Sequence, residues 1–75
     1  MRDNVPNPGK LCICRGQVAL YSTDNSEPAV LRIYTGEILL SLGPVGKLWH
    51  QVLYQEKVWE VDVLAFNSGY IAQCQ

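Results

Sequence analysis

The chain has 75 residues, a formal net charge of −1 and a hydrophobic fraction of 48%. That length allows one domain at most, and so apolar a composition excludes an intrinsically disordered chain. With so small a net charge, no broad cationic field exists to attract nucleic acid or anionic lipid.

Charged residues make up only 17% of the chain, whereas the surface of a soluble monomer usually carries about 25–35%. A core of this size rarely supplies more than ~3–5 kcal/mol, and association with another chain is a common supplement. We therefore expect part of the surface to be covered by a protein partner or by another copy, as a homo-oligomer.

Three features bear on the cellular setting. The three cysteines are an odd number, which rules out a fully paired disulfide framework. No apolar run reaches the roughly 18 residues of a membrane span, and the polar, proline-containing residues 1–10 disfavour a signal peptide. We expect a cytoplasmic protein with no membrane contact.

The chain opens on a segment without regular structure, followed by short strands. Met1–Gly9 contains two prolines and a glycine, which predicts a flexible N-terminal arm ahead of a single domain over residues 10–75. Lys10–Arg15 alternates between two sides, as a half-buried strand does. Gly16 permits a bulge, and Val18–Tyr21 either continues that strand or forms its own.

A polar loop and another strand come next. Ser22–Ala29 consists of turn-forming residues, which predicts an eight-residue surface loop. Val30–Tyr34 returns to β-branched and aromatic residues and predicts a strand.

The region from Gly36 to Val63 predicts a three-stranded antiparallel meander. Its strands are Ile38–Leu42, Leu48–Tyr54 and Lys57–Val63, separated by turns at Gly43–Gly46 and Gln55-Glu56. The second turn lacks the Asn-Gly sequence that tight hairpins prefer, so the register could shift by one residue.

Alternation assigns the side chains of the meander to two faces. Val52 and Tyr54 are expected to point inward, and Trp59 is expected to be at least partly buried. Ile38, Leu40 and Leu42 share one side of their strand while Leu39 occupies the other, which suggests burial on both sides.

The chain ends on a short turn and a last strand. Leu64–Phe66 predicts one 3₁₀ turn, and Tyr70–Cys74 predicts a strand. No segment carries apolar residues at helical spacing over three turns. Short strands with frequent turn signals predict an all-β fold, a small barrel of five to six strands with little or no helix.

The order of motifs resembles the Src-homology-3-like (SH3-like) small β-barrel. Ala19-Leu20-Tyr21 is similar to the Ala-Leu-Tyr that opens those domains, and the polar loop after it stands where their long RT loop stands. Leu31–Gly43 resembles the segment of the family that contains its diverging turn. Trp49 and Val52 stand where the family has its first tryptophan and a small core residue. Val61 and Phe66 stand at its closing apolar positions.

The resemblance implies a fold more firmly than a ligand. Asp62 and Ala65 stand where the peptide-binding members have a proline and a tyrosine. The lead-in Pro8–Cys14 is similar to the first strand of bacterial and phage members, which are often accessory, tail or ribosome-linked modules.

No residue pattern predicts catalysis. His50 is the only histidine, and on an alternating strand it is expected to be a packed or rim residue.

Cys12 and Cys14 share a side and could approach Cys74, and with His50 these thiols could ligate zinc. The spacing differs from that of a zinc knuckle, so we expect packed thiols, no metal and no cofactor. The carboxylates of Glu56, Glu60 and Asp62 are expected to form a solvated face.

The leading hypothesis is a non-enzymatic interaction module that binds a protein partner or itself through exposed aromatic and leucine side chains. The expected anchors of that surface are Trp49, Leu53, Tyr34 and Leu39, with Tyr21 also expected in it.

Two alternatives belong to other classes. A single-stranded nucleic acid could stack on the aromatic side chains, but the cations Arg15, Arg32, Lys47 and Lys57 are scattered along the sequence. A minimal enzyme could instead assemble its site across an oligomer interface, with His50 or Tyr54 at the centre.

Overall fold

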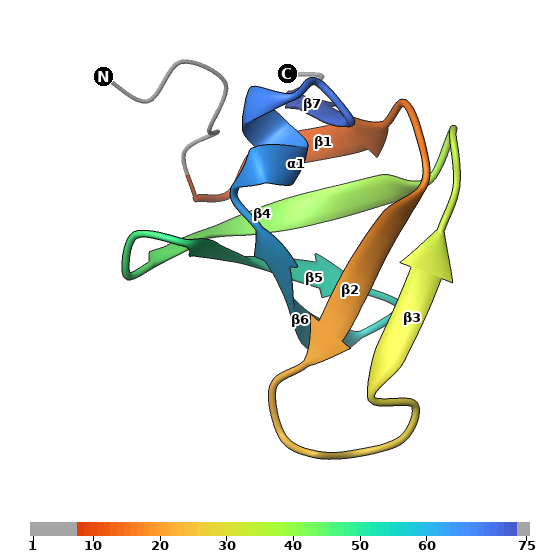
Figure 1. Ribbon diagram of the computed structural model, residues 1–75, viewed down its shortest axis with the longest axis vertical. Helices are drawn as coiled ribbons and strands as arrows, with labels where there is room; N and C mark the ends of the chain where they lie inside the picture. Colours follow the sequence, from red (N-terminus) through yellow and green to blue (C-terminus); the bar gives the residue numbers. More distant parts are fainter. Residues whose placement is uncertain (1–7, 74–75) are drawn as a thin grey trace.

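The computed structural model describes residues 8–73, and within this range the chain forms seven strands and one short helix (Figure 1). The elements in chain order are β1 (Leu11–Cys14), β2 (Val18–Ser22), β3 (Val30–Ile33), β4 (Ile38–Val45), β5 (Trp49–Tyr54), β6 (Lys57–Asp62), α1 (Leu64–Asn67) and β7 (Ile71–Gln73). The all-β prediction is confirmed, with seven strands where five or six were expected.

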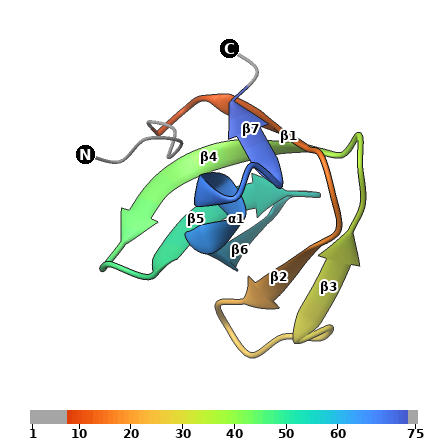
Figure 2. The same cartoon turned by 45° about the horizontal axis from the view of Figure 1, so that its top comes forward.

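The strands form one antiparallel sheet in the order β3-β2-β6-β5-β4-β1-β7. The sheet bends strongly, so that β2 and β3 run across the direction of β4 (Figures 1 and 2). The expected closed barrel is wrong, because β3 and β7 are the two ends of the sheet and no ladder joins them within the described residues. Instead, α1 covers the inner side near β1 and β7 (Figure 2).

The predicted meander is confirmed, with one change. Strand β4 continues past the expected turn at Gly43–Gly46, because a bulge between Ser41 and Gly43 lets the chain resume pairing with β5 up to Val45. Gly43 takes a φ of 111°, a conformation that favours glycine. The turn therefore falls at residues 46–48.

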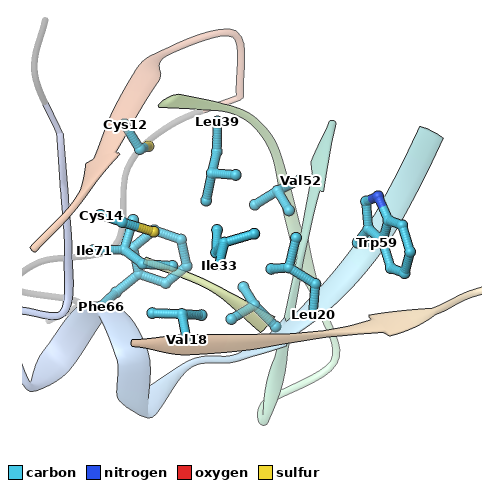
Figure 3. Packing of buried hydrophobic residues seen from close by; sticks show 11 residues of the cluster. Cys12, Cys14, Val18, Leu20, Ile33, Leu39, Val52, Trp59, Phe66 and Ile71 are labelled. Atoms are coloured by element: carbon cyan, nitrogen blue, oxygen red, sulfur yellow. The ribbon is translucent and has the colours of Figure 1, made fainter. Parts of the chain in front are cut away.

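Alternation along the strands builds the core. Cys12 and Cys14 point inward from β1. Val52 and Trp59 point inward from β5 and β6, as expected, and Tyr54, also expected to point inward, is partly buried against the core. Phe66, from α1, points toward Cys14 and Ile71 at one end of the core (Figure 3). The buried apolar side chains are Cys12, Cys14, Val18, Leu20, Ile33, Leu39, Val52, Trp59, Val61, Phe66 and Ile71.

The polar loop between β2 and β3 is organised by one carboxylate. Asp24 Oδ1 accepts hydrogen bonds from the backbone N–H of Ser26 at 3.0 Å and from the hydroxyls of Ser26 and Ser22 at 2.6 and 3.0 Å. Lys57 Nζ lies 3.9 Å from the same oxygen. The bonds from Ser26 and Ser22, with Lys57 nearby, lower the pKa of Asp24 from 3.8 to about 2.

Two predictions at the ends of the chain fall largely outside the described residues. The flexible arm over residues 1–9 stays a prediction; of its described members, Gly9 donates a backbone hydrogen bond to Ser41 O at 2.7 Å. The last strand is β7, and Cys74, which was expected in it, lies outside the described residues. Within residues 8–73, no helix has the length and apolar character needed to cross a bilayer.

Candidate functional site

A groove of about 340 Å³ opens where β2, the end of β6, α1 and the segment before β7 meet. Its lining comes from segments that are distant in the sequence and that the bend of the sheet brings together (Figure 1). The residues that line it are Gln17, Val18, Ala19, Tyr21, Val61, Asp62, Leu64, Ala65, Ser68 and Tyr70.

Residues from both faces of β2 and β6 line this groove. Val18 and Leu20 are buried, so Ala19 and Tyr21 stand on the outer side of β2. On β6, Val61 is buried and Asp62 is exposed. The antiparallel pairing of β2 with β6 then brings the tyrosine and the carboxylate to the same groove.

The helix α1 supplies the next wall. Asp62 Oδ1 accepts a hydrogen bond from the backbone N–H of Leu64 at 2.9 Å, which stabilises the turn into the helix. Over the following turn Phe66 enters the core, while Leu64 stays exposed and Ala65 half-buried at the groove. One carboxylate thus both holds the turn before α1 and lines the groove.

Trp49 adjoins the groove through Tyr21. Trp49 lies opposite Asp62 in the β5–β6 ladder, and its ring meets that of Tyr21 edge to face, with centroids 5.6 Å apart and planes at 80°. Aromatic pairs favour this geometry. Both side chains remain partly exposed, so together they form an aromatic edge with surface left for a ligand.

Tyr70 closes the other side and packs on Gly16. A Cβ built on Gly16 would lie 2.8 Å from Tyr70 Cδ1, so the absence of a side chain at residue 16 is what lets the ring lie there. Tyr70 is 53% exposed. Sequence reasoning placed Tyr70 only as the start of a strand; its packing on Gly16 is a long-range contact with no local signal.

The groove is apolar with a negative side. Asp62 lines it, and Glu60 is the next outward residue of β6, opposite Tyr21 on β2 and Gln51 on β5. The described lining contains no lysine or arginine. A ligand here meets aromatic faces and carboxylates.

The structure separates the predicted anchors. Trp49 and Tyr21 lie together at the groove, whereas Tyr34 follows β3 and is exposed elsewhere. Leu53 is half-buried on the outer side of β5. Leu39 is only 1% exposed and belongs to the core. Its assignment to the binding surface is corrected here, because the inner face of β4 carries Leu39 and the outer face carries Ile38 and Leu40.

The only histidine is buried. Nε2 of His50 lies 2.7 Å from the hydroxyl of Ser41, and the imidazole packs on the Phe66 ring with centroids 4.6 Å apart. Ser41 and His50 are both 0% exposed. A nucleophile and its base must reach a substrate, and this pair is sealed within the core.

The described thiols are packed rather than activated. Burial, with a smaller contribution from the charge of Glu37, raises the pKa of Cys14 from 9.0 to about 11. Cys12 is also fully buried. Within residues 8–73, no three His, Cys, Asp or Glu side chains gather in a way that could hold a metal ion, and Cys74 lies outside that range.

Comparison of the chain with protein-family models, with curated proteins and with solved structures found no match. The groove and the sheet are therefore the basis on which a function can be argued.

Proposed function

We propose that this chain is a non-enzymatic interaction module whose groove binds an extended segment of a partner protein. One observation supports this most directly. Exposed aromatic and aliphatic side chains from β2, β5, α1 and the segment before β7 gather around a single groove of about 340 Å³. Aromatic-lined grooves on small β domains are a recurring way to bind extended peptides.

The chemistry of the groove specifies the peptide. Tyr21, Trp49 and Tyr70 offer flat faces that suit proline or aliphatic side chains in an extended conformation. Asp62 and Glu60 favour a lysine or arginine beside that apolar segment. The expected ligand is therefore an extended apolar segment that carries one or two basic residues.

We further propose an SH3-like relationship for the fold. The support is the order of elements, in which a hairpin with a long polar loop precedes a three-stranded meander, a single helical turn and a last strand. At the groove, Tyr70 would provide the aromatic face that Ala65 lacks, and Asp62 stands where the resemblance would place a proline. The ligand rules of the family's signalling members therefore do not carry over unchanged.

A peptide selection followed by titration tests the proposal. Random twelve-residue peptides displayed on phage are selected against the full chain, and the enriched peptide is titrated into ¹⁵N-labelled protein. We expect enrichment of apolar sequences with a basic residue, and shift changes centred on Tyr21, Trp49 and Tyr70.

Matched tyrosine variants make the test specific. Tyr70→Ala is expected to weaken peptide binding about 10-fold or more, since an aromatic side chain that the ligand buries contributes ~1–2 kcal/mol or more to the binding free energy. Tyr34→Ala serves as the control, because Tyr34 is 59% exposed, close to the 53% of Tyr70, and lies outside the groove. Equal loss in both variants, or shift changes remote from the groove, would count against the proposal.

A further inference from the structure

The segment ahead of the described residues has the composition of the ligand proposed for the groove. Its apolar residues are Met1, Val5 and Pro6, and its one basic residue is Arg2. Val5 and the residue after Pro6 each precede a proline, which favours extended backbone at both positions. The proposed ligand is an extended apolar segment that carries one or two basic residues. The chain therefore contains a sequence that suits its own groove.

The described structure fixes where this segment leaves the sheet. In the β1–β4 ladder Leu11 lies opposite Leu40 with the strands antiparallel, so the chain ahead of β1 runs along β4 toward Val45. Pro8 follows this course and lies at Gly43, where a Cβ built on the glycine would be 3.1 Å from Pro8 Cγ. The absence of a side chain at residue 43 is what lets the proline lie there. Residues 1–7 therefore begin beside the part of β4 that pairs with the start of β5.

A partly apolar path leads from this point to the groove. Val45 lies opposite Trp49, and Trp49 lies opposite Asp62, which lines the groove. Val45 and Trp49 are 41% and 37% exposed. Asp62 stands two strands from Gly43 and two residues farther along, since the ladders pair residues 43, 51 and 60, and this is a separation of about 12 Å. Seven extended residues span about 20 Å or more, so the segment reaches the groove of its own chain.

The spacing of its side chains fits this path. A polyproline II backbone has about three residues per turn and rises about 3.1 Å per residue. Arg2, Val5 and Pro8 then share one side, the side on which Pro8 meets β4. Val5 falls about 9 Å from Pro8, at the level of Trp49 and Asp62. Arg2 falls about 19 Å from Pro8, so its side chain reaches into the groove.

Charge favours the same placement. Asp62 and Glu60 make one side of the groove negative, and its described lining contains no lysine or arginine. Arg2 on the sheet side is attracted to these carboxylates. Asp3 is rotated by about 120° from Arg2 around the backbone axis, so its carboxylate points away from them.

We propose that residues 1–7 occupy the groove of their own chain and compete there with the partner segment. The inference rests on the proposed function, because the segment is matched to the ligand that the groove is proposed to bind. A short tether gives the segment an effective concentration of about 1 mM or more at the groove, so even a weak contact fills a substantial fraction of grooves. The apparent affinity for the partner falls by the fraction that stays open.

Nuclear Overhauser contacts in the full chain test the placement. We expect contacts from the methyl groups of Val5 to the ring of Trp49, and from the side chain of Arg2 to groove residues. Since the segment lies in its own groove, their relative strength should be the same at about 50 µM and about 1 mM protein.

A matched pair of uncharged replacements in the segment locates the contact. Val5→Asn removes the apolar side chain that faces Trp49, and Asn4→Ala changes a residue outside the shared side. Val5→Asn should shift the amide signals of Tyr21 and Trp49 and tighten binding of the selected peptide about 2- to 5-fold. Asn4→Ala should do neither. Both variants are checked for the amide shifts of the parent chain at core positions.

Three results would overturn the inference. They are the absence of contacts between Val5 and Trp49, equal effects of the two variants, and contacts that grow with concentration, which would place the segment in the groove of a neighbouring copy. Its failure is distinguishable from failure of the proposed function. A selected peptide that binds the groove of the parent and of Val5→Asn with equal affinity removes only the inference. Intact Val5 contacts in a chain that enriches no peptide remove only the partner.

Discussion

Ser41 and His50 show how one buried polar pair is accommodated in an apolar core. The hydroxyl of Ser41 and Nε2 of His50 are 2.7 Å apart, with neither side chain exposed. Their strands are neighbours, and Ser41 pairs with Val52 in the β4–β5 ladder. Since a buried polar group is costly unless it is hydrogen-bonded, this contact restricts which side chains residues 41 and 50 can carry.

Replacing Ser41 by alanine tests that contact. Ser41→Ala removes the hydroxyl from Nε2 of His50 and should lower the free energy of unfolding by about 1–3 kcal/mol. Urea denaturation followed by tryptophan fluorescence measures the change. Ser68→Ala is the control, since Ser68 is exposed and its loss should stay within about 0.5 kcal/mol. Equal effects in the two variants would argue against a stabilising pair.

At the scale of one element, the β5–β6 hairpin has the tightest turn in the described chain. Tyr54 pairs with Lys57, leaving Gln55 and Glu56 as a two-residue loop. Both take positive φ, 52° and 63°, as a type I′ turn requires. The register that the sequence left open is therefore settled, and two residues without a left-handed preference are held in that conformation by their strands.

This turn predicts a stabilising change. Replacing Gln55-Glu56 by Asn-Gly should raise the free energy of unfolding by about 1–2 kcal/mol, because a left-handed conformation costs that much for an ordinary residue. The melting temperature should rise by roughly 4–8 °C per kcal/mol. Glu60→Gly, at a strand position outside the positive-φ set, should lower it instead. A lower melting temperature in the Asn-Gly variant would contradict the turn assignment.

At the scale of the molecule, one aromatic side chain joins the helix to strands from both ends of the chain. Phe66 is fully buried, contacts His50 on β5, and lies beside Cys14 and Ile71 (Figure 3). Since β1 and β7 pair with each other at the end of the sheet, Phe66 packs the helix against strands from both ends of the chain.

The size of the domain makes this residue decisive. Phe66→Ala should remove about 3–5 kcal/mol, which equals the whole stability expected of so small a core, ~3–5 kcal/mol. We expect a largely unfolded chain at 37 °C, seen as loss of strand circular dichroism and of amide shift dispersion. Tyr70→Ala, which removes a half-exposed ring, should remain folded. A cooperative native transition in Phe66→Ala would show that the fold does not depend on the Phe66 ring.

The sequence determined the secondary structure closely, because the information for it is local. Period-two alternation, together with the turn residues, placed the strands, the meander and the polar loop within a few residues. It also predicted that Val52 and Trp59 point inward. One miss, the length of β4, came from the bulge at Gly43, where a glycine served to continue a strand rather than to end it.

Only the tertiary structure decided which face is inside where a strand is apolar on both faces, and which distant residues meet. Strand β4 is apolar on both faces, so alternation alone could not choose between Leu39 and Leu40; its place between β1 and β5 put Leu39 in the core. The open sheet and the groove of Tyr21, Trp49 and Tyr70 likewise follow from pairings between residues far apart in the chain. Such contacts depend on how the whole sheet bends, which no short stretch of sequence encodes.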